Sequence, residues 1–240
     1  MLKSRLCIAF FAFAVGCAPA QKPLTDYVNP MLGTATLWDS VDLGFKPTKR
    51  TWGAEVFPGS SLPNAMVQVS PVTKFHSGAG YQYEDSVIYG FTHTNKGHWN
   101  LCHIPLLPVT GTPTPGDYCS PFSHERESAA PGYYQVFLDR YGVDAQLSST
   151  LRCAFHKYTY PARAAPAVLA DLQRSNEHVR AGDIRKEGDN VFAGWQQTGE
   201  KMYFYAVANR PVTGIEPVVE GDREVRIVRF GEGDGALELR

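Results

Sequence analysis

Residues 90–100, GFTHTNKGHWN, are too polar and too aromatic to be an ordinary loop. They hold two histidines, a lysine, two asparagines and a tryptophan within eleven positions. Imidazoles ligate metals or transfer protons, whereas an indole ring flanked by amides holds a ligand. The run therefore poses three alternatives: a metal site, a catalytic site or a ligand site.

The spacing of the histidines argues against a metal site. His93, His98 and His103 follow one another at intervals of five residues. Five residues turn a helix by about 140°, so neighbouring histidines would point to different faces. On a strand, an odd interval places them on opposite faces. We therefore expect no metal site in this chain.

Nucleophilic and carboxylate chemistry receive little support either. Cys102 and His103 are adjacent, and adjacent residues on an extended chain point apart, so they form no dyad. The sequence has no G-x-S-x-G run. Four acidic residues are more typical of solvated loops than of a catalytic pair: Glu55, Glu84, Asp85 and Asp117.

Ligand binding fits the residue types better. Aromatic faces cover the C–H groups of sugars, and planar polar side chains hydrogen-bond to their hydroxyls. Residues 95–100 supply both, and residues 49–59 repeat the combination. The competing interpretation is that Trp52 and Trp99 fill the core. The candidate sugar-binding residues are Trp52, Glu55, His93, His98, Trp99 and Asn100.

These residues need a rigid framework, and the pattern predicts one made of strands. Apolar and polar residues alternate in many short runs that are separated by Gly/Pro turns. In residues 143–149, Val143, Ala145 and Leu147 should face inward. The prolines of residues 104–109 favour an edge strand or a crossing. The fold class predicted is all-β, an antiparallel sandwich or barrel.

The last residues begin another strand, with Leu237 and Leu239 on one face. A strand that has just begun needs a partner, so we expect the natural polypeptide to continue past Arg240. The predicted domain spans residues 21–240. With 240 residues, 43% of them hydrophobic, the chain can bury one core. A net charge of −1 gives no reason to expect a nucleic-acid partner.

Residues 1–20 have the pattern of an export signal. A basic start precedes an apolar run, residues 6–16, that is too short to span a bilayer. Cleavage after APA (18–20) would leave Gln21 first, whereas a lipobox ending at Cys17 would give a lipid anchor. Both alternatives predict a protein in the periplasm, on the outer membrane as a lipoprotein, or outside the cell. Contact with a membrane is expected only through that anchor.

Three cysteines follow the signal: Cys102, Cys119 and Cys153. An odd number allows at most one disulfide, and the pairing stays open. Their spacing matches no zinc pattern. We expect each to be a free, buried cysteine that packs like a small apolar residue.

Several motifs in order carry a family resemblance. VNPMLGT (28–34), residues 53–73 and residues 80–94 are similar to the N-terminal region of glycoside hydrolase family 92, a family of bacterial exo-acting α-mannosidases. Residues 131–161 and AVLADL (167–172) continue the similarity. The resemblance covers roughly residues 26–240.

The resemblance implies an N-terminal β-sandwich of the galactose-mutarotase-like type, packed on a helical (α/α) barrel of the same polypeptide. It implies calcium-dependent, inverting hydrolysis of terminal α-mannosides, as on N-glycans. The catalytic acid and base and most calcium ligands would lie in the barrel, so no catalytic residue is expected in this chain. Residues 51–59 and 93–100 would form part of the mannose pocket wall.

Two departures from the family pattern leave this wall in question. Ala54 and Glu55 stand where many members carry a histidine–threonine pair, and residues 95–103 replace a loop of the LSGTG type. Two alternatives from other classes are a stand-alone carbohydrate-binding sandwich without activity and a purely structural domain of a surface lipoprotein.

Overall fold

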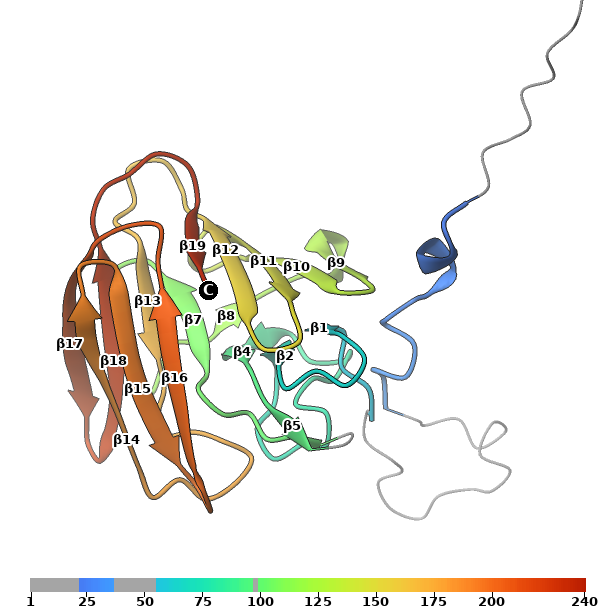
Figure 1. Cartoon of the computed structure of the whole chain (residues 1–240), viewed down its shortest axis with the longest axis horizontal. Coiled ribbons are helices and arrows are strands. Elements are labelled where there is room, and N and C mark those ends of the chain that lie inside the picture. The colour runs from blue at the N-terminus through green and yellow to red at the C-terminus, as the bar shows by residue number, and fades with distance from the viewer. Residues whose placement is uncertain (1–21, 37–54, 97–98) are drawn as a thin grey trace, which may run out of the picture.

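The computed structural model describes residues 22–36, 55–96 and 99–240. Strands dominate these residues, and every strand pairing is antiparallel. Two single turns of 3-10 helix accompany them, η1 (Leu24–Tyr27) and η2 (His124–Arg126). The predicted all-β, antiparallel sandwich is confirmed (Figure 1).

One layer is a seven-stranded sheet. Its strands, in spatial order, are β1 (Ser60–Ser61), β2 (Gln68–Val72), β4 (Gly90–Thr92), β7 (Leu106–Val109), β13 (Ala167–Ala170), β18 (Arg223–Phe230) and β17 (Val212–Glu220). A five-stranded sheet follows the order β19 (Leu237–Leu239), β12 (Ala154–Thr159), β11 (Val143–Ser149), β10 (Tyr133–Leu138) and β9 (Glu127–Ala130). A three-stranded sheet contains β14 (Ala181–Gly188), β15 (Val191–Gln197) and β16 (Lys201–Val207). Two short ribbons pair β3 (Val87–Ile88) with β8 (Ser120–Pro121), and β5 (Asn95–Lys96) with β6 (Trp99–Asn100).

The five-stranded and three-stranded sheets form one continuous layer through β19. On one side β19 pairs with β12, and on the other Leu239 bridges to Ala208. Val207 and Arg240 exchange two backbone hydrogen bonds, of 2.8 and 3.0 Å. Figure 1 shows β19 between β12 and β16. The sandwich is therefore this layer facing the seven-stranded sheet.

Alternation along the strands produces the core, as predicted. In β11 the side chains of Val143, Ala145 and Leu147 are buried while those between them are partly exposed. Leu237 and Leu239 are buried in the same way. Apolar side chains from both layers join in a single cluster. The two-residue period of a strand thus accounts for which side chains are inside.

The prediction that residues 104–109 form an edge strand or a crossing is wrong. β7 lies inside the seven-stranded sheet, between β4 and β13. Its pairing with β4 is confined to Phe91 and Leu106, so Pro108 lies two residues beyond that contact. On the other side Pro108 is paired with Val168. The strand accommodates a residue without an N–H because its neighbour β4 is short.

Several predictions fall on residues that the structure does not describe, including the export signal, Cys17, Trp52 and His98. Among the described residues, no helix has the length and apolarity to cross a membrane. Cys102, Cys119 and Cys153 are all free thiols, so no disulfide joins them. Only Cys102 is the buried residue that was expected; Cys119 is half-buried and Cys153 is exposed.

Candidate functional site

Asn176 holds three chain segments together around the hairpin formed by β5 and β6. Its Nδ2 donates to the backbone oxygens of Ser77, at 3.0 Å, and Asn100, at 2.5 Å. Its Oδ1 accepts from the backbone N–H of His76 at 2.6 Å. The backbone N–H of Asn100 also donates to Gly78 at 2.9 Å. We call these three segments, residues 73–80, residues 95–96 with 99–102, and residues 171–179, the loop cluster.

Trp99 projects from this cluster. The residue is 52% exposed on β6, so the alternative that its indole fills the sandwich core is wrong. An aromatic ring held on a short paired strand and facing solvent is a suitable platform for the C–H face of a sugar. Glu55 is exposed as well. Their roles as sugar contacts stay predictions.

Asn100, the neighbour of Trp99, faces the opposite way and is 1% exposed. Its Oδ1 accepts from the backbone N–H of Cys102 at 2.8 Å. Its Nδ2 donates to the hydroxyl of Thr92 at 3.2 Å. The amide is therefore used within the fold, and the structure reassigns Asn100 from a sugar contact to a support of the hairpin.

His93 is likewise committed to the fold. Its Nδ1 lies 3.1 Å from the backbone oxygen of Ile104, and its Nε2 lies 2.9 Å from Nε2 of His156. His156 Nδ1 lies 2.7 Å from the Tyr158 hydroxyl. One neutral arrangement satisfies all three contacts: Tyr158 donates to His156, His156 to His93, and His93 to Ile104. Neither ring nitrogen of His93 is left for a ligand, which is a correction to its predicted role.

Burial sets the protonation of this histidine pair. It lowers the pKa of His93 to about 4. It lowers the pKa of His156 well below the ordinary value, and a charge on His93 would lower it further. Both imidazoles are therefore neutral at neutral pH.

A second series of hydrogen bonds, which runs through His103 and was not predicted from the sequence, supports the loop cluster. Thr94 lies 2.9 Å from His103 Nδ1, and His103 Nε2 lies 3.1 Å from the Thr198 hydroxyl. Thr198 in turn donates to a carboxylate oxygen of Glu177 at 2.6 Å. Burial lowers the pKa of His103, an effect that Glu177 partly offsets. This series of hydrogen bonds fastens the hairpin to the 171–179 segment and to the end of β15.

A hollow of about 550 Å³ lies against the loop cluster. Within it, the guanidinium of Arg174 sits over three aromatic rings, 5.2 Å from Phe75, 5.1 Å from Tyr89 and 5.9 Å from Tyr118. These cation–π contacts hold the guanidinium in place. The lining residues are Thr73, Lys74, Phe75, His76, Tyr89, Gln173, Arg174, Ser175, Glu177, His178 and Val179.

The described residues that line the hollow are suited to binding a ligand. Lysine, arginine, amide and hydroxyl groups line it beside two aromatic rings, a combination that fits an oxygen-rich ligand. Glu177 is the one carboxylate among its described lining residues. Glycoside hydrolysis needs two carboxylates that flank the bond, and the described lining residues supply one.

Asp171 anchors the base of the same segment. Its side chain is completely buried and accepts from the Tyr118 hydroxyl and from Arg223, each at 2.7 Å. Arg174 approaches the same oxygen at 4.0 Å. A buried carboxylate that is satisfied in this way positions its neighbours and is closed to a substrate.

A further buried carboxylate lies apart from the loop cluster. Glu127 accepts from the hydroxyls of Tyr81, at 2.9 Å, and Tyr134, at 2.6 Å. His124 Nδ1 contacts it at 2.5 Å, while Nε2 of the same ring faces the backbone oxygen of Tyr83 at 2.7 Å. Burial raises the pKa of both tyrosines, and the charge on Glu127 adds to this. The Glu127 side chain is 1% exposed, so this cluster serves the fold.

Residues 27–234 match the family model for the glycosyl hydrolase family 92 N-terminal domain. Comparison with curated proteins finds no match. Among the described residues, no group of three or more histidine, cysteine or acidic side chains could hold a metal ion.

Solved structures of other proteins share the fold, among them the following three. The family GH92 α-mannosidase BT3965 from Bacteroides thetaiotaomicron, in complex with mannoimidazole, is 24% identical with a TM-score of 0.76 and is matched over 91% of this chain. The GH92 inverting mannosidase BT2199 from the same species is 23% identical, with a TM-score of 0.71 over 92% of this chain. The GH92 family glycosyl hydrolase ccman5 is 23% identical, with a TM-score of 0.69 over 90%.

This chain spans 32% of the length of each of these three proteins. The likeness thus concerns one part of a larger molecule, and the family model names that part as the N-terminal one. The chain therefore belongs to glycosyl hydrolase family 92, and its residues 27–234 are the N-terminal domain that defines this part of the family's members.

Proposed function

We propose that this chain is the N-terminal domain of an exported, calcium-dependent, inverting exo-α-mannosidase that acts on terminal α-mannosides of glycans. The family match over residues 27–234 is the observation that carries the proposal. The names of two relatives with the same fold, an α-mannosidase and an inverting mannosidase, support the choice of substrate and stereochemistry.

Within such an enzyme, the loop cluster would form part of the wall of the mannose pocket. Three features favour it over the rest of the surface. The hairpin presents an exposed indole, Asn176 fixes the hairpin to its neighbours, and a polar, aromatic hollow adjoins them. We assign Trp99 as the sugar platform, with Glu55, Trp52 and His98 as further contacts.

The catalytic carboxylates and the calcium ion belong to the (α/α) barrel in this proposal. The described residues offer no cluster of acidic groups that fits calcium, and the carboxylates of Asp171 and Glu127 are buried and satisfied. Calcium would supply its charge next to the reacting sugar from the barrel. The part left to this chain is to bind and orient the glycan.

The export signal predicted in residues 1–20 supports a site of action outside the cytoplasm, where the enzyme would encounter glycan substrates. Cleavage after Ala20 and lipidation of Cys17 give different mature forms. Mass spectrometry of the mature N-terminus distinguishes the two forms, and an intact Met1 would contradict export.

The test compares this chain with the polypeptide in which it is joined to its (α/α) barrel. We expect the joined protein to hydrolyse 4-nitrophenyl α-D-mannoside and to release β-mannose first, as followed by proton NMR. This chain alone should be inactive. A joined protein without activity, or one that releases α-mannose first, would contradict the proposal.

Substitution of Trp99 tests the wall. In the joined protein, Trp99→Ala should raise KM about three- to tenfold, because one aromatic contact to the sugar is lost. The unfolding midpoint should stay close to that of the parent, since the indole is exposed. Phe155→Ala, which removes an aromatic side chain 41% exposed on β12, is the matched control. A lower midpoint with an unchanged KM would return Trp99 to a structural role.

A further inference from the structure

The outer face of the three-stranded sheet carries aromatic residues that the core does not need. β15 and β16 pair so that Trp195 lies opposite Tyr203, and Ala193 opposite Tyr205. Tyr203 is 72% exposed and Tyr205 is 65% exposed. We call this surface the β14–β16 face. Its rings stand on paired strands, so they are held out in solvent without the disorder of a loop.

The opposite face of the same strands supplies the core. Phe192 is fully buried. Its ring centroid lies 6.4 Å from that of Phe204 and 6.1 Å from that of Phe230 of β18. Ile184 of β14 is buried in the same layer. Packing against the seven-stranded sheet therefore explains the apolar residues of the inner face and leaves Trp195, Tyr203 and Tyr205 without a structural reason.

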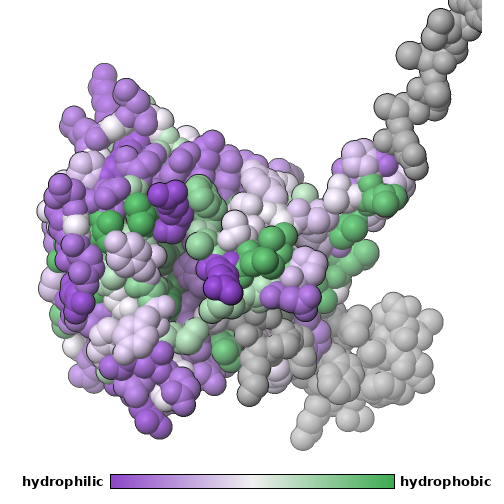
Figure 2. All heavy atoms as spheres, in the orientation of Figure 1, coloured by the Kyte–Doolittle hydropathy of each residue, from purple (hydrophilic) through white to green (hydrophobic). Residues whose placement is uncertain are grey.

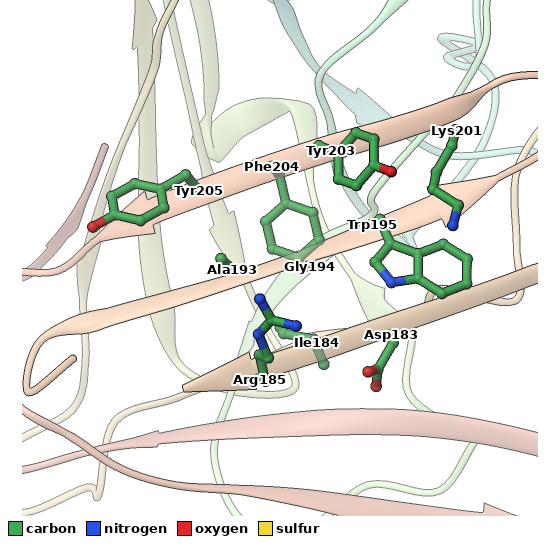
Figure 3. Close-up of a pocket in the computed structure, with 10 residues that line it drawn as sticks. All are labelled: Asp183, Ile184, Arg185, Ala193, Gly194, Trp195, Lys201, Tyr203, Phe204 and Tyr205. Carbon is green, nitrogen blue, oxygen red and sulfur yellow. The ribbon is translucent and has the colours of Figure 1, made fainter. Parts of the chain in front are cut away.

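These rings surround a hollow of about 470 Å³ (Figure 3). Ala193 forms part of its floor because its small side chain stands between larger neighbours. The Lys201 Nζ lies 4.0 Å from the centre of the Trp195 ring and 6.0 Å from that of Tyr203. Figure 3 shows Lys201 reaching toward Trp195, with Asp183 on the other side of the indole.

The charges on this face balance one another. Asp183 and Arg185 project from β14 on the same side as the rings, and Arg185 forms an ion pair with Glu187 at 2.6 Å. Together with Lys201, they give two positive and two negative groups. Figure 2 shows residues of pale, intermediate hydropathy in this region, bordered by strongly hydrophilic ones. A neutral, hydroxyl-rich ligand suits such a surface better than an ionic one.

We propose that the β14–β16 face is a second carbohydrate-binding site, which takes a neutral polysaccharide and lies apart from the loop cluster. Tyr203 and Tyr205 stack on the C–H faces of successive sugar rings, while Trp195 holds Lys201 beside them through its cation–π contact. Asp183, Arg185 and Lys201 hydrogen-bond to hydroxyl groups. Interfaces between proteins are enriched in Tyr, Trp and Arg as well as depleted in Lys and Asp, so cover of this face by another domain is an outcome of the test.

The ligand class rests on the proposed function, which makes a mannose polymer the natural probe. The experiment is affinity electrophoresis of the protein through native gels that contain soluble yeast mannan. It is done in the Trp99→Ala background so that the loop cluster contributes little. We expect mannan to retard the protein, and Tyr203→Ala and Tyr205→Ala each to weaken the apparent affinity about three- to tenfold.

Phe155→Ala is again the control, and its retardation should equal that of the parent. Equal retardation of Tyr203→Ala, Tyr205→Ala and parent would overturn the proposal, as would no retardation at all. A hydroxyl-radical labelling experiment on the protein joined to its barrel, without sugar, gives a further check. Protection of both tyrosines from labelling would overturn the proposal, because another domain would then cover the face. Hydrolysis of 4-nitrophenyl α-D-mannoside is measured separately, so loss of binding here leaves the proposed activity standing.

Discussion

Replacement of Asn176 by alanine should loosen the loop cluster more than any other polar substitution we consider. The change removes two donated hydrogen bonds and one accepted bond. A net contribution of about 1 kcal/mol for each bond gives a loss of about 3 kcal/mol. Partial exposure of these bonds makes about 2 kcal/mol the lower bound. Asn176→Asp should cost at least as much, because a carboxylate cannot donate to the oxygens of Ser77 and Asn100.

Urea unfolding measures the loss in the global free energy of unfolding. Hydrogen exchange of the backbone amides of residues 76–80 and 99–102 measures the loss of local stability. Asn209→Ala is the matched control. Asn209 also bridges two backbone groups, of Ala236 and Glu238, but it lies outside the cluster. Its substitution should lower the midpoint without faster exchange in the hairpin. A cost below about 2 kcal/mol for Asn176→Ala, or unchanged exchange, would refute the role we give to Asn176.

Two other predictions concern buried ionisable groups. Because the folded-state pKa of His93 is about 4, the unfolded chain binds the proton first as pH falls below 6.5, so stability should decrease from pH 6.5 toward pH 4. His93→Gln should flatten this dependence in urea midpoints, and an equally steep profile would contradict the neutral pair. Glu127→Ala should cost about 3 kcal/mol, because three donors lose a buried acceptor. Glu216→Ala, which removes the exposed partner of Arg229, should cost under about 1 kcal/mol, and similar costs for the two would count against a structural role for Glu127.

Alternation predicted the framework strands because one face of each strand is in the core. It succeeded for β11 and β19, where buried and exposed residues follow the two-residue period. It failed where pairing partners decide the outcome. Residues 86–91 alternate as a single strand would, but Val87 and Ile88 pair with β8 while Gly90–Thr92 joins the seven-stranded sheet. The change of sheet depends on partners that are distant in the sequence.

The candidate site was only partly predictable, for the same reason. The polar residues of the 90–100 run were noticed correctly, but composition could not show which way each side chain faces. Trp99 and Asn100 are adjacent, and strand geometry sends one outward and the other inward. Asn176 and Arg174 gave no signal in their own segment. Their contacts lie with Ser77, Asn100 and Phe75, about a hundred positions or fewer away, and only the fold brings these together.

The position of β19 has a consequence for how the domain is made. Leu239 pairs with His156 and bridges to Ala208. The layer made of the five-stranded and three-stranded sheets therefore stays in two pieces until residues 237–240 have left the ribosome. Until then the nascent chain carries β12 and β16 as unpaired edges, which are prone to pair with other chains. Such late, long-range pairing also slows folding. A domain that folds as it is synthesised therefore passes through an intermediate that lacks a single three-residue strand.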